Sequence, residues 1–271
     1  MANTPKSHLP KKRWSQNFLK DPNIARKIAS ALQLDHPALI IEVGPGQGIL
    51  TRFLLEGTDR LFAVEIDPRL AAALPASLHH PGILEVIEAD FMKFDLTKIL
   101  QQFPDHYKGI IGNLPYHITT PILFRTLEQA NFLQQAVFMT QKEVAQRICA
   151  DPGSKTYGIL SVFCQFYARV EYLFTVPAHL FSPAPGVDSG VIRFSFTFEA
   201  EKTLLNPSLF REIVRLTFGQ RRKMLRNTLS GLYPRFILDQ LNIDLSRRPE
   251  SLSVEEFADL SNQLQKIHMS A

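Results

Sequence analysis

The chain has 271 residues, 45% of them hydrophobic, so it can bury a full core and is expected to form one large domain with a smaller appendage. No apolar run approaches the roughly 20 residues of a membrane span. Residues 1–20 contain no apolar leader, which together with the missing span indicates a cytoplasmic protein. The two cysteines lack metal-binding companions, so neither a disulfide framework nor a metal site is expected. The net charge is only +4.

Residues 1–20 are predicted to form a basic arm, because its lysines and arginines all precede the first acid, Asp21. Such a cluster is by itself as compatible with a solvated surface as with a binding site. A second basic cluster near the other end of the chain favours a polyanionic partner, since neutralising phosphates releases counterions. The candidates for nucleic-acid contacts in the arm are Lys11, Lys12 and Arg13.

Short β-branched runs alternate with amphipathic stretches in the first two-thirds of the chain, a pattern typical of a doubly wound α/β domain. The last predicted strand has a period-two pattern that indicates an antiparallel, half-exposed position in a mixed sheet. We therefore expect residues 21–199 to form a Rossmann-like α/β domain. The predicted strands span residues 39–43, 61–66, 83–89, 109–112, 136–140 and 191–198.

A glycine-rich segment, Glu-Val-Gly-Pro-Gly-Gln-Gly at residues 42–48, follows the first of these strands. Glycines allow a tight turn and close approach of the backbone to a nucleotide-like ligand. The glycine spacing and Pro45 are atypical of a pyrophosphate cradle, so a ligand with a neutral ribose and an amino acid fits better. Glu42, Gly44 and Gly46 are the candidate contacts, and a turn without a ligand is the alternative.

The next two strands end in acids that could complete a site for one adenosine. Glu65 follows the glycine loop by about twenty residues, where a carboxylate can accept hydrogen bonds from both ribose hydroxyls. Asp90 could accept from the adenine amino group, with the neighbouring Ile66 and Phe91 as apolar candidates to pack on the ring. Each acid alone would more often be a solvated turn residue; the glycine loop shifts the balance toward a binding site.

The segment Asn113-Leu114-Pro115-Tyr116 follows the fourth strand and is the most specific motif in the chain. Methyl transfer to an exocyclic amine needs acceptors that hold the amine hydrogens and aim its lone pair, and the Asn113 oxygen and the Leu114 carbonyl could provide them. Pro115 fixes the turn, and Tyr116 offers a face on which an adenine could stack. A turn with a structural tyrosine is the alternative.

Residues 200–271 are predicted to form a small helical domain. Asn206 and Pro207 mark a helix start, and Ser253 with Glu256 forms a capping box for a closing helix. Between them we interpret residues 218–227 as a basic helix that presents its cations outward. Its candidate RNA contacts are Arg221, Arg222, Lys223 and Arg226.

On these residues the chain closely resembles the KsgA family of ribosomal RNA adenine dimethyltransferases, relatives of the Erm resistance methyltransferases. The resemblance spans nearly the whole chain. Besides the glycine loop, Glu65, Asp90 and the Asn113 motif, it rests on Ser-Gln-Asn-Phe-Leu at residues 15–19, Phe-Met-Thr-Gln-Lys-Glu at residues 138–143 and Phe-Ser-Pro-Ala-Pro-Gly-Val-Asp-Ser at residues 181–189.

The resemblance implies a class I methyltransferase domain that binds S-adenosylmethionine and releases S-adenosylhomocysteine, followed by a helical RNA-binding domain. It implies that Gln16, Asn17, Leu19 and Asn113 lie at or near the cofactor. It also implies that Phe181 helps hold the target adenine against Tyr116. The implied substrate is two adjacent adenosines in a hairpin loop near the 3′ end of 16S rRNA within a pre-30S particle, with a role in small-subunit ribosome biogenesis. A monomer is expected.

Two other interpretations remain open. An Erm-like enzyme acting on large-subunit rRNA would share the same cofactor site, so that site does not separate the two. A ribosome-assembly or transcription-associated factor could use the fold only to bind RNA, although the presence of Glu65, Asp90 and Asn113 favours catalysis. A nicotinamide oxidoreductase is disfavoured because no hydride-transfer residues accompany the glycine loop.

Overall fold

The computed structural model describes residues 17–78, 80, 82–197 and 200–270, and the chain forms two compact units. The larger unit comprises residues 1–145 and 171–196, and the smaller one comprises residues 146–170 and 197–271. Our expected boundary after residue 199 had left residues 146–170 in the larger unit. They belong with the C-terminal helices because α7 (Ile159–Tyr167) packs against α8 (Pro207–Gly219), with the rings of Phe163 and Phe210 5.9 Å apart.

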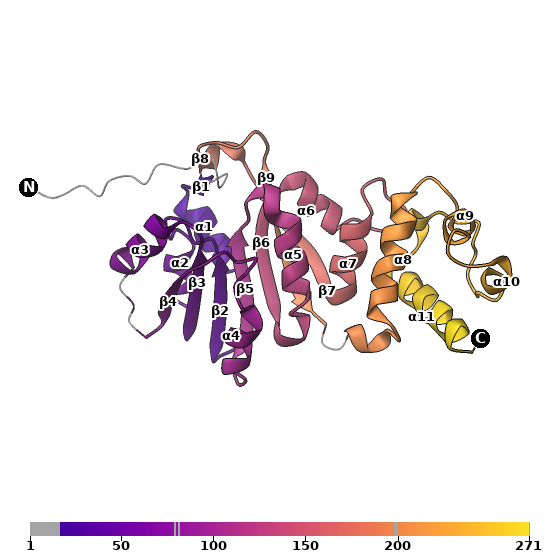
Figure 1. Cartoon of the computed structure of the whole chain (residues 1–271). Coiled ribbons are helices and arrows are strands. Elements are labelled where there is room, and N and C mark those ends of the chain that lie inside the picture. The colour runs from indigo at the N-terminus through magenta and orange to yellow at the C-terminus, as the bar shows by residue number, and fades with distance from the viewer. Residues whose placement is uncertain (1–16, 79, 81, 198–199, 271) are drawn as a thin grey trace, which may run out of the picture. The chain divides into compact units, whose positions relative to one another are not determined.

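A seven-stranded sheet forms the centre of the larger unit, in the order β4-β3-β2-β5-β6-β9-β7 (Figure 1). Its first five strands pair in parallel, and β9 pairs antiparallel to β6, which confirms the predicted mixed sheet. The strands are β2 (Ala38–Val43), β3 (Arg60–Glu65), β4 (Leu84–Glu88), β5 (Tyr107–Asn113), β6 (Gln135–Gln141), β7 (Ala168–Val176) and β9 (Ser189–Phe196).

The six predicted strands are all present, with ends shifted by at most two residues. The expected half-exposed position of β9 is wrong in its first half, where Val191 and Ile192 are fully buried. We did not predict β7, which pairs with the other edge of β9, and Val191 packs in one apolar cluster with Ala25 and Ile28.

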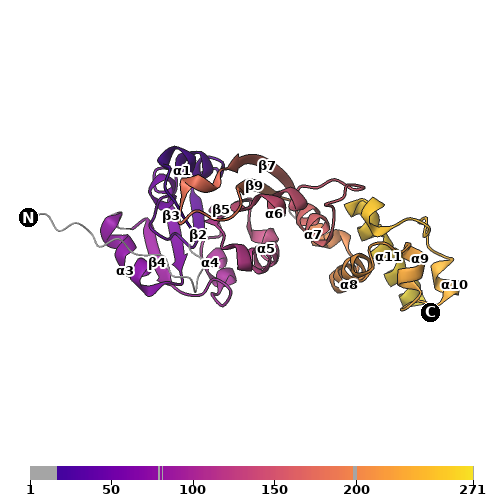
Figure 2. The same ribbon diagram turned by 90° about the horizontal axis from the view of Figure 1, so that it is seen from above.

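Helices cover both faces of this sheet, α1 (Pro22–Ala29) on one side and α4 (Leu96–Gln102) and α5 (Thr119–Leu127) on the other (Figure 2). Asp21 begins α1 by accepting hydrogen bonds from the amides of Asn23 and Ile24 at 2.8 and 3.2 Å. Helix α1 shares one apolar cluster with α2 (Thr51–Leu54) and the sheet. The other α-helices in the described residues are α3 (Pro68–Ser77), α6 (Lys142–Ile148), α9 (Leu225–Leu229), α10 (Arg235–Leu238) and α11 (Val254–Ser270).

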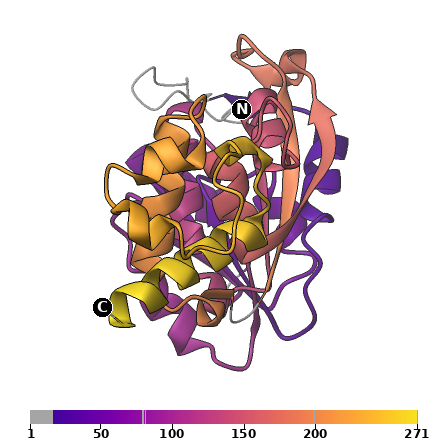
Figure 3. The ribbon, with the colours of Figure 1, turned by 90° about the vertical axis from the view of Figure 1, so that its right-hand side faces the viewer.

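The smaller unit is mainly helical in its described residues. Figure 3 shows it toward the viewer, with α8 in orange and α11 in yellow. Asn206 caps α8 by accepting from the amides of Ser208 and Leu209, both at 3.1 Å. The predicted capping box of α11 is also confirmed: the Ser253 amide donates to Glu256 at 2.7 Å, and the Glu256 amide donates to the Ser253 hydroxyl at 3.2 Å.

The basic segment between α8 and α9 is not a helix, which corrects our interpretation of residues 218–227. Helix α8 ends at Gly219, residues 220–224 form a turn, and α9 begins at Leu225. Phe218 therefore lies at the end of α8 and Leu225 at the start of α9. The cations of this turn are described with the candidate site below.

Gly48 in the glycine loop gives a prediction about stability. Its φ is +77°, and an added Cβ would lie 2.5 Å from Leu74 Cδ1 and 2.9 Å from Leu78 Cδ1. We expect Gly48→Ala to lower the free energy of unfolding by at least about 1 kcal/mol, through backbone strain and overpacking. The matched control is Gly57→Ala, because a Cβ at Gly57 meets no atom within 4 Å. Equal denaturation midpoints for the two variants would contradict the prediction.

Candidate active site

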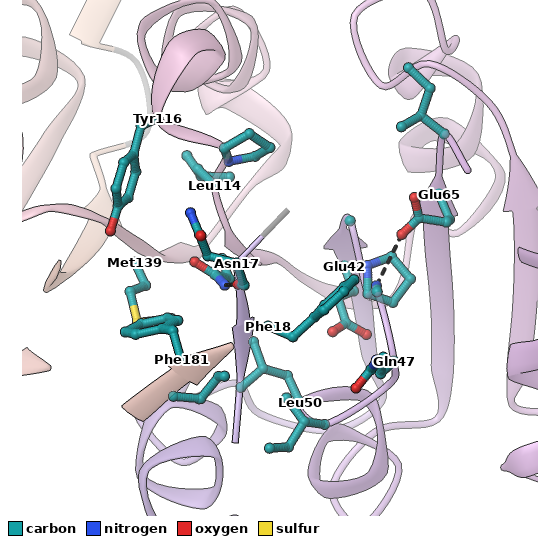
Figure 4. Close-up of a pocket in the computed structure, with 18 residues that line it drawn as sticks. Asn17, Phe18, Glu42, Gln47, Leu50, Glu65, Leu114, Tyr116, Met139 and Phe181 are labelled. Atoms are coloured by element: carbon teal, nitrogen blue, oxygen red, sulfur yellow. Dashed lines mark hydrogen bonds between the residues drawn. The ribbon is translucent and has the colours of Figure 1, made fainter. Parts of the chain in front are cut away.

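One cavity opens at the carboxyl ends of β2, β3, β5 and β6, and all its lining residues belong to the larger unit (Figure 4). Its volume is about 890 Å³, including the opening to solvent. Glu65 lies on one side of it, and Leu114, Tyr116, Met139 and Phe181 gather on the other. The lining residues are Asn17, Phe18, Leu19, Glu42, Gly44, Pro45, Gly46, Gln47, Ile49, Leu50, Glu65, Ile66, Asn113, Leu114, Pro115, Tyr116, Met139 and Phe181.

The Glu65 carboxylate connects the glycine loop to β3. One oxygen accepts the Gly46 amide at 3.0 Å and the other accepts the Asp67 amide at 2.9 Å. These two bonds fix the carboxylate plane and leave lone pairs on both oxygens for further donors, such as a pair of ribose hydroxyls. Burial raises the pKa of Glu65, whereas the two backbone amides lower it. The geometry fits the predicted ribose clamp.

Glu42, at the end of β2, is the most unusual ionisable group in the cavity. It is 1% exposed, and its Oε2 has no hydrogen-bond partner among the described residues. Its pKa is raised to about 8, mainly by burial and to a smaller extent by the nearby charge of Glu65. A buried carboxyl group with an unused oxygen is suited to a cationic donor. The amino group of an amino-acid ligand would meet that need.

Of the predicted adenine contacts, only one lines the cavity. Ile66 lines the cavity and is 42% exposed, so it offers an apolar surface for a planar ring. Asp90 and Phe91 do not line the cavity. The Asp90 side chain turns back to accept the Met92 amide at 2.9 Å, and Phe91 is buried. The end of β4 therefore contributes less to the cavity than the ends of β2, β3 and β5.

The Asn113–Tyr116 turn begins at the last residue of β5, close to its predicted position. The Asn113 amide nitrogen donates to the Asn17 carbonyl at 3.1 Å, so its oxygen is left for another donor. The Leu114 amide donates to the Met139 carbonyl at 2.9 Å, which fixes the turn to β6. Pro115 has φ −58° and ψ 129° and is followed by a 3-10 helix over Tyr116–Ile118. Two oxygen acceptors, of Asn113 and Leu114, are thus available on one short turn.

Tyr116 is half-buried at the wall of the cavity, and its hydroxyl is 2.9 Å from the Ser189 hydroxyl. Burial raises the pKa of the phenol, which keeps it protonated. Phe181 is 2% exposed and Met139 is fully buried, so the wall near Tyr116 is apolar. An aromatic face next to apolar walls is suited to a nucleobase.

The end of the N-terminal arm lies over this cavity. Its strand β1 (Phe18–Leu19) pairs antiparallel with β8 (Phe181–Ser182), and the Lys20 amide donates to the Leu180 carbonyl at 2.9 Å. A Cβ added to Gly46 would lie 3.0 Å from the Phe18 ring, so the arm packs closely on the glycine loop. The same two-stranded ribbon therefore covers the glycine loop and carries Phe181. The predicted residues Lys11, Lys12, Arg13 and Gln16 lie outside the described residues.

Sequence reasoning missed several residues of the cavity wall. Pro45 and Gln47 stand inside the glycine motif and could have been included from their position alone. Met139 gave a weaker signal, the end of the strand after Asn113, while Ile49 and Leu50 read only as part of an amphipathic helix.

The four predicted cations of the smaller unit fall into two groups. Arg221 donates to the Ser154 carbonyl at 3.1 Å and lies 3.9 Å from Glu250, and Arg226 pairs with Asp239 at 3.0 Å. By contrast, Arg222 and Lys223 are exposed, with no ion pair to any residue that the structure describes. Of the four predicted RNA contacts in this unit, these two are the most available to a phosphate.

The structure also addresses metal and membrane binding within the described ranges. No cluster of three or more His, Cys, Asp or Glu side chains there is arranged to hold a metal ion. None of the helices in residues 17–78, 80, 82–197 and 200–270 is long and apolar enough to cross a bilayer.

Glu42 leads to a prediction about stability and pH. Since its pKa rises from 4.5 to about 8 on folding, the folded state binds the proton more tightly, and stability falls as pH rises from about 4.5 to about 8. We expect Glu42→Gln to remove this loss, so that its melting temperature relative to the wild type increases between pH 5 and pH 8.5. The control is Glu85→Gln, which changes an exposed carboxylate on β4. If the melting temperatures of Glu42→Gln and the wild type change equally with pH across this range, the buried carboxyl does not titrate as stated.

Comparisons with known proteins give relatives over nearly the whole chain. The family model described as "Ribosomal RNA adenine dimethylase" matches residues 7–266. A "Ribosomal RNA small subunit methyltransferase A" of Marinomonas sp. is 40% identical over 259 residues, 96% of this chain and 97% of the relative. A protein of the same name from Phocaeicola vulgatus is 43% identical over 262 residues, 94% of this chain and 90% of the relative.

Solved structures share the architecture. A dimethyladenosine transferase from Plasmodium falciparum superimposes with a TM-score of 0.77 at 23% identity, covering 92% of this chain and 97% of that one, which shows the fold. The 23S rRNA methyltransferase ErmE has a TM-score of 0.70 at 29% identity, covering 92% of this chain and all of that one. With the family model matching nearly the whole length, the chain belongs to the ribosomal RNA adenine dimethylase family and is a methyltransferase.

Proposed function

We propose that the protein transfers methyl groups from S-adenosylmethionine to N6 of two adjacent adenosines in the 3′-terminal hairpin loop of 16S rRNA. Its small-subunit relatives, at 40% identity and above over almost the whole chain, support this choice of RNA. Four transfers would convert both adenosines to N6,N6-dimethyladenosine, releasing S-adenosylhomocysteine each time. A pre-30S particle is the proposed substrate, and the protein acts as a monomer in the cytoplasm.

The cavity residues fit S-adenosylmethionine by their chemistry. Glu65 would accept the ribose hydroxyls, Ile66 would pack on the adenine, and the unpartnered Oε2 of Glu42 would accept the ammonium group. We keep Asp90 as the proposed acceptor of the adenine amine, with Phe91 supporting its turn. Asn17 and Leu19 would cover the ligand from the arm, and Gly44 and Gly46 would admit it to the loop.

When bound, S-adenosylmethionine supplies an electrophilic methyl group: a nitrogen–carbon bond forms, the carbon–sulfur bond breaks with its electron pair staying on sulfur, and the amine gives its proton to water. The residues of the chain align the amine for this displacement. The Asn113 oxygen and the Leu114 carbonyl would accept the two N6 hydrogens, and Tyr116 would stack on the base, with Phe181 on the same apolar wall.

The observation that carries the proposal is the hydrogen bond from the Asn113 amide nitrogen to the Asn17 carbonyl, at 3.1 Å. This bond uses the donor end of the amide and leaves the acceptor end for the substrate amine. The same contact joins the arm over the cofactor region to the turn that holds the base. Both substrates would therefore be held by connected parts of one site.

The test is transfer of labelled methyl groups from S-adenosylmethionine to small-subunit particles that lack the modification, with large-subunit RNA in parallel. We expect label in N6,N6-dimethyladenosine of the small-subunit RNA. Asn113→Ala is expected to lower kcat/KM by roughly 100-fold or more while S-adenosylmethionine binding, measured by calorimetry, is retained. Asn131→Ala, which changes an exposed asparagine outside the cavity, is the matched control and is expected to match the wild type.

The parallel arm of this experiment decides between the alternatives. The similarity to ErmE favours a large-subunit substrate as the second candidate, and label confined to large-subunit RNA would establish it. Label in neither RNA would overturn both proposals and leave an RNA-binding factor.

We propose further that residues 200–271 grip the RNA backbone, chiefly through Arg222 and Lys223. Removing both side chains is expected to reduce the slope of log affinity against log salt by about 1 per residue, with cofactor binding unchanged. Arg221→Ala is expected to lower the melting temperature instead, because Arg221 bonds to the Ser154 carbonyl and lies near Glu250.

The control for the salt dependence is the double variant Lys93→Ala/Lys98→Ala, which removes two exposed cations of the larger unit. Filter binding to small-subunit RNA at several salt concentrations measures the slope. An unchanged slope for the Arg222→Ala/Lys223→Ala variant would refute the assignment.

A further inference from the structure

The phenol of Tyr116 is anchored to the sheet by a buried hydroxyl group. Its oxygen lies 2.9 Å from Ser189 Oγ, and Ser189 is fully buried at the first position of β9. A tyrosine held only by packing could swing about its Cα–Cβ torsion, whereas a hydrogen bond at the far end of the ring holds that end in place. Ser189 therefore fixes the position of the ring that Tyr116 presents to the cavity.

A second buried hydroxyl holds the peptide just before that ring. Thr119 Oγ1 donates to the Pro115 carbonyl at 3.1 Å and lies 3.0 Å from Thr140 Oγ1, and both threonines are buried. Because the only hydroxyl hydrogen of Thr119 goes to Pro115, Thr140 must be the donor in the other bond. Thr140 lies on β6, whose residue Gln141 pairs with Ser189 of β9. The two hydroxyl groups that tie this region to the sheet, those of Ser189 and Thr140, therefore belong to adjacent strands.

These bonds confine the Leu114 carbonyl from both sides. The peptide before Leu114 is fixed by the hydrogen bond that the Leu114 amide donates to the Met139 carbonyl at 2.9 Å. The peptide after Pro115 is fixed by Thr119 and by the Ile118 amide, each bonding the Pro115 carbonyl at 3.1 Å. With both neighbouring peptide units held, the Leu114 carbonyl has little freedom to rotate.

We propose that Ser189 and Thr119 are positioning residues that hold the Tyr116 ring and the Leu114 carbonyl in the geometry required for the second methyl transfer to each adenosine. This inference rests on the proposed function and names residues that do not themselves touch the substrate. Neither Ser189 nor Thr119 lines the cavity.

The second transfer depends on this frame more than the first. An unmodified amine has two N–H groups, and the two acceptors of the turn can hold both. After one methylation only one N–H remains, so hydrogen bonding constrains the amine less, and stacking on a fixed ring supplies more of the alignment. A loosened Tyr116 or Leu114 would therefore slow the second transfer more than the first, and the monomethylated product would accumulate.

The experiment measures the ratio of N6-methyladenosine to N6,N6-dimethyladenosine by mass spectrometry during turnover, on whichever ribosomal subunit the wild type modifies. We expect Ser189→Ala and Thr119→Val each to raise this ratio and to lower kcat for the second transfer by roughly tenfold, with an unchanged Kd for S-adenosylmethionine. Thr126→Val is the matched control. Thr126 is also buried on α5 and bonds the carbonyl four residues before it, at 3.0 Å, but it lies away from the turn.

Tyr116→Phe removes the same hydrogen bond without altering β9, so it decides the matter even if Ser189→Ala fails to fold. We expect a raised ratio in Tyr116→Phe, and the double variant Tyr116→Phe/Ser189→Ala is expected to be no worse than either single variant, because both lose one bond. A wild-type product ratio in Tyr116→Phe, or additive losses in the double variant, would overturn the inference. Failure of the wild type to modify small-subunit RNA would count only against the proposed substrate, since the ratio can be read on either RNA.

Discussion

The parallel pairing of β2 with both β3 and β5 is the constraint on which the site depends. In this register Val43 stands opposite Val64 on one side and Gly112 on the other. The next residue of each strand or loop is Gly44, Glu65 or Asn113, so three motifs that are far apart in sequence begin at the same level. A shift of register by one residue would turn every second side chain to the other face and separate them.

That constraint explains why much of the site could be predicted from sequence. A strand buried on both faces appears as a continuous apolar run, and the polar residue at which the run stops marks its carboxyl end. Glu42, Glu65 and Asn113 could be identified in this way. Asp90 also follows a strand end, but its side chain is used by the Met92 amide, and a local turn of this kind has no counterpart in the hydrophobic pattern.

Sequence patterns could not predict contacts between segments that are too short to show a hydrophobic periodicity. The pairing of Phe18 with Ser182 joins two-residue strands from opposite parts of the chain, and such short strands carry no alternation to read. The same limit applies to the turn at residues 220–224, where one cation is committed to the Ser154 carbonyl and its neighbours are not. The family resemblance indicated that these segments are functionally important, and the structure shows which atoms make the contacts.

Glu42 shows how a binding site differs from a core. Folding buries its carboxyl group with one oxygen unpartnered, and burial raises its pKa to about 8. An apolar residue of similar size would avoid this desolvation cost, so packing alone does not account for an acid at this position. A cationic ligand would reverse the balance, because a charge partner favours the ionised form and supplies the missing hydrogen bond. The cost of burying this carboxylate and the affinity for a cationic ligand would then have a common origin. Side chains that lower the stability of the fold are expected at the functional sites of an enzyme.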